Sequence, residues 1–333
     1  MERPIKNASV CVIGGAGFLG SHLVDYLVEE RACKVLVLDN LITGQKRFVN
    51  PKATFVWFDI TGSEEALRKI FEEHEIDYVF NYAAEPYIPV SFKHPIRVFN
   101  INAFGAFKVM SAAQEKRGGI RGVLQVSSAE IYGNVSGKIS EDAKVEPHSS
   151  YGASKAAIDA MVQVSWRERK SPVIAMRQFN CVGERETHPY VIPEIIKQIS
   201  EIPAHVIEDK KKNSLSVEVK LGNNSFRDFQ YAGDAVRMAV ELLEKGQFGE
   251  VYNMGSEDGV QIYDLATMIG RIMDVSVTVI EDESRKRPWE IWHLQSDNKK
   301  LYSTISARPK VSLEESLERT IEWFHKNGGK WDF

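Results

Sequence analysis

The chain has 333 residues, of which 43% are hydrophobic and 26% charged, and its formal net charge is −4. This length suits one large domain or two modest ones with a sizeable core. Charges of both signs are mixed along the chain, so the sequence offers neither the basic stripe that binds nucleic acid nor the polybasic cluster that binds an anionic membrane. Residues 1–9 lack the apolar core of a signal peptide, which favours a cytoplasmic protein.

The three cysteines are widely separated in the sequence and odd in number. Cys11, Cys33 and Cys181 are therefore expected to be reduced, buried thiols. Neither a disulfide framework nor a metal site is predicted.

A glycine-rich turn follows the first expected strand, Ser9–Ile13. Three glycines spaced by three residues lie where this strand turns into a helix with apolar periodicity over residues 18–30. Such glycines allow a tight turn and let a pyrophosphate approach the backbone, while the helix N-terminus supplies amide donors. The pattern predicts a dinucleotide site. Its expected contacts are Gly14, Gly17, Phe18, Leu19 and Gly20.

The second expected strand, Lys34–Leu38, ends in an acidic residue. Asp39 lies 19 residues after Gly20 (39 minus 20). A carboxylate at this point accepts hydrogen bonds from both ribose hydroxyls and repels a 2′-phosphate, which favours NAD over NADP. Asn40 beside it is included in the predicted cofactor site.

Two further strand ends extend this site. Thr54–Phe58 is followed by Asp59 and Ile60, and Asp59 is a candidate for binding the adenine amino group or, alternatively, for capping a turn. A helix over Ser63–Glu73 precedes the strand Asp77–Asn81. The small residues after that strand, Ala83 and Ala84, leave room for a cofactor, although small residues also serve packing.

A long helix is expected from Pro95 to about Lys116. It carries Asn102 and an apolar face with Phe104 and Phe107, which we interpret as core or as a helix-helix dimer contact. The following strand, Arg121–Val126, delivers Ser127 and Ser128 to its carboxyl end, where open parallel sheets bind ligands.

The helix that begins near residue 150 carries a tyrosine and a lysine four positions apart. At this spacing Tyr151 and Lys155 share one helix face, so the ammonium can lie beside the phenol ring. A cation there favours the phenolate and lowers the tyrosine pKa. Lowering it by roughly 3 units takes about 4 kcal/mol, so a second positive charge such as an oxidised nicotinamide is needed. The pair predicts proton abstraction from a sugar hydroxyl.

The segments GGAGFLGSH, NYAAEP, VSSAEIYG and YGASK, with Asp39 and Asn102, resemble the extended short-chain dehydrogenase/reductase family, and in particular its nucleotide-sugar epimerases and dehydratases. The resemblance covers nearly the whole chain. It implies a Rossmann-type doubly wound α/β domain over residues 1–178 that binds NAD. A smaller α/β domain over residues 179–333 would bind the nucleotide sugar, with some segments crossing back, and the family expectation is a homodimer.

The resemblance also implies roles for individual residues. Ser128 orients the sugar 4-hydroxyl, Tyr151 is the base, and Lys155 binds the nicotinamide ribose. Glu130 matches the glutamate with which dehydratases remove the C5 proton once C4 is a ketone. The residue before it, an aspartate or serine in those enzymes, is Ala129 here. The general acid is therefore open, with Glu85, Tyr87, His188 or a water as candidates.

The second half is expected to hold the nucleotide sugar. Family positions that bind its diphosphate or base match Asn180, Ile192, Arg227 and Arg287, and Glu85 of the first half is added to this substrate set. Trp289 and Trp292 are expected to cover the core or, alternatively, to stack on a base. The three-lysine run at residues 210–212 is interpreted as a solvated loop.

The predicted activity is transient oxidation of a nucleotide sugar at C4 by NAD, followed by C5 proton abstraction and loss of water. The first alternative is a 4-epimerase, which needs no carboxylate beside the sugar. A decarboxylase and a C5 epimerase are further alternatives. A nucleotide-sensing protein without activity is the rival from another class, because a fold alone does not establish catalysis.

Overall fold

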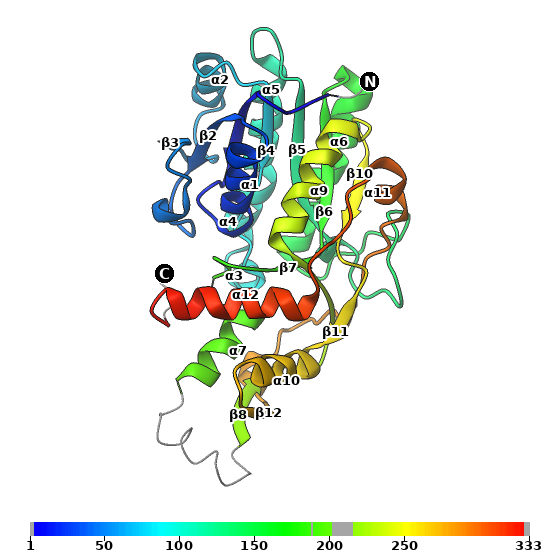
Figure 1. Cartoon of the computed structure of the whole chain (residues 1–333). Helices are drawn as coiled ribbons and strands as arrows, with labels where there is room; N and C mark the ends of the chain where they lie inside the picture. Colours follow the sequence, from blue (N-terminus) through cyan, green and yellow to red (C-terminus); the bar gives the residue numbers. More distant parts are fainter. Residues whose placement is uncertain (1–2, 188, 202–215, 330–333) are drawn as a thin grey trace.

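The structure is a computed structural model that describes residues 3–187, 189–201 and 216–329. Its larger unit is built on a parallel seven-stranded sheet with the order β10-β6-β5-β4-β1-β2-β3 (Figure 1). The strands are β1 (Ser9–Ile13), β2 (Lys34–Asp39), β3 (Thr54–Trp57), β4 (Tyr78–Asn81), β5 (Gly122–Ser128), β6 (Val173–Gln178) and β10 (Val251–Met254).

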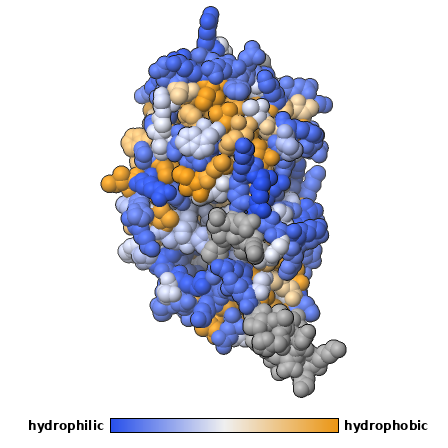
Figure 2. Space-filling model, turned by 90° about the vertical axis from the view of Figure 1, so that its left-hand side faces the viewer, coloured by the Kyte–Doolittle hydropathy of each residue, from blue (hydrophilic) through white to orange (hydrophobic). Residues whose placement is uncertain are grey.

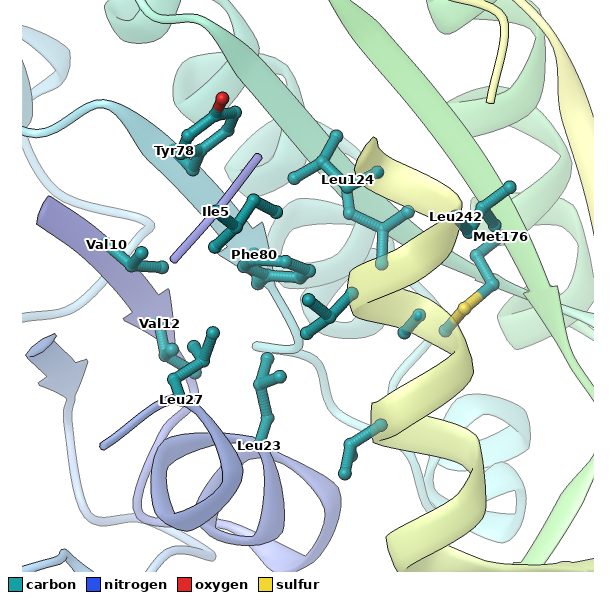
Figure 3. Packing of buried hydrophobic residues seen from close by; sticks show 14 of the residues in the cluster. Ile5, Val10, Val12, Leu23, Leu27, Tyr78, Phe80, Leu124, Met176 and Leu242 are labelled. Atoms are coloured by element: carbon teal, nitrogen blue, oxygen red, sulfur yellow. The ribbon is translucent and has the colours of Figure 1, made fainter. Parts of the chain in front are cut away.

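Helices cover both faces of this sheet, which confirms the predicted doubly wound α/β class. One face packs against α1 (Phe18–Glu29) and α9 (Ala232–Lys245). Figure 3 shows Leu23 and Leu27 of α1 and Leu242 of α9 meeting the strand residues Val12 and Phe80 in this core. The other face packs against α2 (Glu64–Glu73), α5 (Ala106–Glu115) and α6 (Ser150–Arg169).

Local sequence signals set the ends of the helices. Ser63 and Ser149 precede α2 and α6, and each side chain accepts a hydrogen bond from a backbone N–H of the first turn. At its other end α6 stops at Lys170, whose left-handed backbone (φ 55°) closes the last turn. The cap at Ser149 places the start of α6, and therefore Tyr151, at the carboxyl edge of the sheet.

The smaller unit has a core of its own. Isoleucines of α7 (Val191–Ser200) and α10 (Ile262–Ile272) pack with β8 (Ser216–Leu221) and α12 (Leu313–Lys326). Its remaining elements are β7 (Asn180–Val182), β9 (Phe226–Tyr231), β11 (Gly259–Gln261), β12 (Ser276–Glu281), β13 (His293–Leu294) and α11 (Lys299–Thr304). In Figure 1, α7, α10, β8 and β12 lie below the large sheet, and α12 crosses the molecule between the two groups.

Chain segments beyond residue 178 return to the larger unit. β10 pairs with β6 as the seventh strand, and α9 covers the sheet beside α1. A boundary at 178/179 describes the two units only if α9 and β10, which follow it in the sequence, are counted with the larger unit. This boundary stays a proposal.

Two expectations differ from the structure, and a third falls outside its described residues. The helix expected from Pro95 is divided into α4 (Pro95–Phe99), a π-helical turn over Asn100–Gly105 and α5, and a short helix, α3 (Ile88–Lys93), precedes it. Trp289 and Trp292 are 68% and 58% exposed, so the preferred interpretation that they cover the core is wrong. They follow the charged stretch SRKR, and neither side chain belongs to one of the apolar core clusters. The three-lysine run lies outside the described residues.

Hydrophobic residues also occur on the outside of the molecule. Figure 2 shows a band of them across the upper half of one face, above a mainly hydrophilic lower half. Among the helices of the described ranges, none is long and apolar enough to cross a membrane.

Candidate active site

A cavity of about 1060 Å³ opens at the carboxyl ends of the large sheet and is lined by residues of both units. It includes the ends of β1 and β4, where the strand order reverses, which is where open α/β sheets bind ligands. The cavity brings together almost all the predicted site residues. Those that line it are Gly14, Gly17, Phe18, Leu19, Gly20, Asp39, Asn40, Asp59, Ile60, Ala83, Ala84, Glu85, Ser127, Ser128, Glu130, Tyr151, Lys155, Asn180, Arg227 and Arg287.

Two predicted residues do not line the cavity. Asn102, predicted to contact the cofactor, is buried in the π-helical turn, where it accepts from the Glu85 N–H (2.8 Å) and donates to the Glu85 carbonyl (3.2 Å). It therefore holds the backbone of a lining residue. Ile192, predicted to contact the substrate, is fully buried in the core of the smaller unit because it lies on the inner face of α7.

The cofactor end of the cavity is shaped by glycines. Gly14 has φ +79°, and a Cβ there would lie 2.7 Å from the Ala83 nitrogen. A Cβ on Gly20 would collide with the Gly14 carbonyl oxygen. Only glycine allows this close approach of β1, α1 and β4. The resulting cradle at the N-terminus of α1 fits a pyrophosphate.

Two aspartates complete this end. Asp39 is 8% exposed and accepts from the N–H groups of Ala16 (3.0 Å) and Leu41 (2.8 Å). Burial raises its pKa, and these amides partly offset the shift. Asp59 accepts from Thr61 N–H at 2.8 Å and from the Asn40 amide at 3.0 Å, so it organises a turn while also lining the cavity.

Lys155 lies beside Tyr151 as the spacing predicts. Its Nζ is 5.8 Å from the centre of the Tyr151 ring and donates to the Val126 carbonyl at 3.0 Å. Both side chains are almost completely buried, and burial lowers the pKa of Lys155 to about 8. The cation is thus held against the carboxyl end of β5.

Lys155 alone does not lower the pKa of Tyr151, in line with the expectation that a second positive charge is needed. Burial raises the pKa of Tyr151 to about 12, a hydrogen bond with Ser128 lowers it, and the charge of Glu130 raises it. The free-energy cost of burying a phenolate exceeds the stabilisation that these neighbours provide. The protein by itself therefore holds Tyr151 as a neutral phenol.

Ser128 and Glu130 are joined by a tight turn at the end of β5. The Ser128 hydroxyl accepts from the Glu130 N–H at 3.2 Å and caps the short 3-10 helix Ala129–Ile131. Burial raises the pKa of Glu130, while Arg287 and Arg227 partly offset this shift. Arg287 Nη1 lies 4.0 Å from a Glu130 oxygen. A carboxylate in this position can accept a proton from a ligand in the cavity.

The two predicted phosphate-binding arginines share a carboxylate that was not predicted. Arg227 is 3.0 Å from Glu290, and Arg287 is 3.9 Å from the same oxygen. Asn223 donates to the other Glu290 oxygen at 2.7 Å. Glu290 therefore orients both guanidinium groups toward the cavity that all three residues line.

Of the candidate acids, Glu85 and Tyr87 line the cavity, whereas His188 lies outside the described residues. Glu85 is 3.4 Å from Arg97. Other lining residues were missed by the sequence reasoning, among them the polar Gln178, Glu186, Tyr190 and Glu290. No local motif marks them. Only their position at the end of β6, or within about ten residues of the predicted Asn180 and Arg287, could have suggested them.

The sequence profile of the NAD dependent epimerase/dehydratase family matches residues 10–255 of this chain. The chain belongs to this family. The match extends from β1 through β10 and includes the glycine turn, β5 and α6. It confirms the predicted extended short-chain dehydrogenase/reductase fold and NAD as the cofactor.

Individual relatives of this family member carry two activities. The chain is 29% identical to a mouse protein named dTDP-D-glucose 4,6-dehydratase, over 97% of this chain and 90% of that protein. It is 28% identical to a UDP-glucose 4-epimerase of Thermotoga maritima solved with UDP-glucose, with a TM-score of 0.83 over 96% of this chain and 99% of the other. A dTDP-glucose 4,6-dehydratase of Streptomyces venezuelae with NAD bound is 25% identical, with a TM-score of 0.83 over 97% and 99%.

Proposed function

We propose that this family member is an NAD-dependent dehydratase of nucleotide sugars, which oxidises the sugar transiently at C4 and removes water across C5 and C6. The observation that carries the proposal is the placement of Glu130. Its carboxylate lines the cavity on the same turn as Ser128, with Arg287 within 4.0 Å. A 4-epimerase needs no such base.

The cavity suits both ligands. The glycine cradle would hold the pyrophosphate of NAD, Asp39 its adenosine ribose, and Lys155 its nicotinamide ribose. When bound, NAD supplies a hydride acceptor for the sugar C4 and a positive charge near Tyr151. Asn180, Arg227 and Arg287 would bind the sugar nucleotide diphosphate, since a guanidinium pairs bidentately with phosphate oxygens.

Side chains of this protein carry out the proton transfers. Tyr151 accepts the proton of the 4-hydroxyl, and Ser128 orients that hydroxyl through its bond with the tyrosine. Once C4 is a ketone, the C5 proton is acidic, and Glu130 removes it. Loss of the 6-hydroxyl leaves a double bond between C5 and C6. The hydride taken from C4 would then return to C6 with a proton to C5, so that the product is lighter by one water alone.

A 4-epimerase is the second candidate, and Ala129 favours it. A methyl side chain cannot protonate a leaving hydroxyl, whereas an epimerase has no leaving group. The similarity to the epimerase of Thermotoga maritima, at 28% identity, is as close as that to the dehydratases.

A panel of UDP-, dTDP-, GDP- and CDP-sugars incubated with the purified protein separates the two functions. A dehydratase product is lighter than its substrate by one water, and an epimerase product has the same mass. Mass spectrometry and NMR of the products are therefore sufficient. Conversion of one of these sugars with no change in mass would overturn the dehydratase proposal.

We also propose a homodimer formed through α4, the π-helical turn and α5. Ile96 and Phe104 on this face are 85% and 53% exposed. Phe104 makes edge-to-face contacts with Phe99 and Phe107, at 6.0 and 6.1 Å between ring centres. An exposed aromatic cluster on adjacent helical turns suits a helix-helix contact between two copies.

A further inference from the structure

Elimination of a hydroxyl requires a proton donor, and the position that usually precedes the catalytic glutamate holds Ala129. Hydroxide is a poor leaving group, so an acid must protonate it as the C–O bond breaks. A donor in this cavity must meet two conditions. It must carry a proton at neutral pH, and its side chain must line the cavity.

Glu186 meets the second condition. It follows β7 and lines the same cavity as Glu130. The residue is only 4% exposed, yet it lines the cavity. Within the described ranges its Oε2 atom has no hydrogen-bond partner. A buried, unpartnered carboxyl oxygen is costly unless a ligand provides its partner.

The turn that carries Glu186 is held firmly on α1. The carbonyl of Glu184 is 2.7 Å from His22 Nε2, and Arg185 forms an ion pair with Asp25 at 2.7 Å. Arg185 has φ +67°, a backbone conformation that is strained for a residue other than glycine. These contacts direct residues 184 and 185 toward α1 and leave Glu186 facing the cavity.

Tyr190 lines the cavity together with Glu186 and Tyr151. Burial raises the pKa of Tyr190 well above its usual range, and the charges of Tyr151 and Glu186 are among those that raise it further. Since Tyr151 is the group that meets the sugar 4-hydroxyl, Glu186 shares its cavity with the group at the reacting end of the sugar.

The two carboxyl groups have different surroundings. Arg287 and Arg227 stabilise the charge of Glu130. At Glu186, burial raises the pKa well above its usual range, and no cation of the described residues offsets the shift. Cys181 of β7 and Tyr190 interact electrostatically with Glu186, and both are neutral when buried. Environments that separate two carboxyl groups in this way assign one as base and the other as acid.

We propose that Glu186 is the general acid of this cavity and protonates the departing 6-hydroxyl, a role that rests on the proposed dehydratase function. The C5–H bond breaks and its proton passes to the Glu130 carboxylate. The electron pair left on C5 forms the C5=C6 double bond as the C6–O bond breaks. The proton of Glu186 passes to that oxygen, which leaves as water. After this step Glu130 is protonated and Glu186 is ionised.

The test uses Glu186→Gln and a substrate whose leaving group needs no proton. Fluoride is a much weaker base than hydroxide, so a 6-deoxy-6-fluoro analogue of the accepted sugar nucleotide can eliminate without an acid. We expect Glu186→Gln to slow water loss from the natural substrate by about 10²–10⁴-fold. The same variant should eliminate fluoride from the analogue at a rate near that of wild type. In D2O it should still exchange the C5 proton, because Glu130 is intact.

Glu184→Gln is the matched control. Its carboxylate lies on the same turn and accepts from the Tyr231 hydroxyl at 3.0 Å, but it is not among the residues that line the cavity. Equal losses of Glu186→Gln on both substrates would indicate a structural role and overturn the proposal. Unchanged water loss would overturn it as well. A wild-type protein that removes water from none of the sugars contradicts the proposed function itself, which is a different outcome.

A second measurement does not depend on turnover. The infrared difference spectrum between wild type and Glu186→Gln should contain the carbonyl band of a protonated carboxylic acid at neutral pH. A difference spectrum with only carboxylate bands would show that Glu186 is ionised and therefore unable to act as the acid.

Discussion

Tyr151 is the residue at which burial and chemistry conflict most directly. The protein raises its pKa to about 12, although the proposed reaction needs it as a base. A positive charge delivered with the cofactor beside Lys155 would reverse this balance only when the site is loaded. The arrangement prevents an ionised phenolate from being held in the unloaded cavity.

Replacement of Tyr151 by phenylalanine tests its role. The ring and its packing remain, but the hydroxyl that exchanges a proton is lost. We expect kcat to fall by about 10²–10⁴-fold. Affinity for the sugar nucleotide, measured by calorimetry, should change little. Wild-type turnover in this variant would contradict the assignment.

The protonation state of Glu130 determines how activity should depend on pH on the acidic side of the pH profile. As a base it must be ionised, and burial raises its pKa above that of an ordinary glutamate, about 4.3. The kcat/KM value should therefore rise with pH through a value above this ordinary one. In Glu130→Gln the residual activity should lack this acid limb. An identical acid limb in the variant would assign it to another group.

At the scale of elements, the π-helical turn holds the loop after β4. Its extra residue allows the Asn102 amide to bond both backbone groups of Glu85 and the Ser154 hydroxyl of α6. Such bulges frequently occur at functional sites. The turn thus links three segments of the cavity wall although Asn102 does not itself reach the cavity.

Asn102→Ala should destabilise the fold. The variant leaves buried Glu85 backbone groups without partners, which costs about 1–3 kcal/mol. The free energy of unfolding, measured with urea, should fall by that amount. Asn100→Ala on the same turn is the control, because Asn100 is exposed and its replacement should change stability by less than about 0.5 kcal/mol. Equal stability of the two variants would contradict the role of Asn102 in holding the backbone of Glu85.

For the whole molecule, the exposed aromatic face predicts the oligomeric state. Phe104→Glu places a charge in the proposed helix-helix contact, where it would be desolvated without a partner. Sedimentation velocity should show a dimer for wild type and a monomer for this variant. Ile280→Glu, on β12 of the smaller unit, is the control and should remain dimeric. A monomeric wild type would overturn the proposed dimer.

The sequence alone determined the doubly wound class, NAD and most of the cavity wall. Those inferences depend on short-range relations: glycines between a strand and a helix, an acid at a strand end, and a tyrosine and lysine one helical turn apart. Local geometry is sufficient for these because each motif acts within a few residues along the chain.

Only the tertiary structure decided the remaining features, because they depend on burial and on contacts between distant segments. Burial raises the pKa of Tyr151, an effect that the spacing of Tyr151 and Lys155 could not reveal. Glu290 meets Arg227 across 63 residues of sequence. Glu186 becomes a candidate acid because the fold turns it into the cavity and leaves one oxygen without a partner among the described residues. Packing in the folded chain determines desolvation and long-range pairing, and a local pattern of residues does not predict that packing.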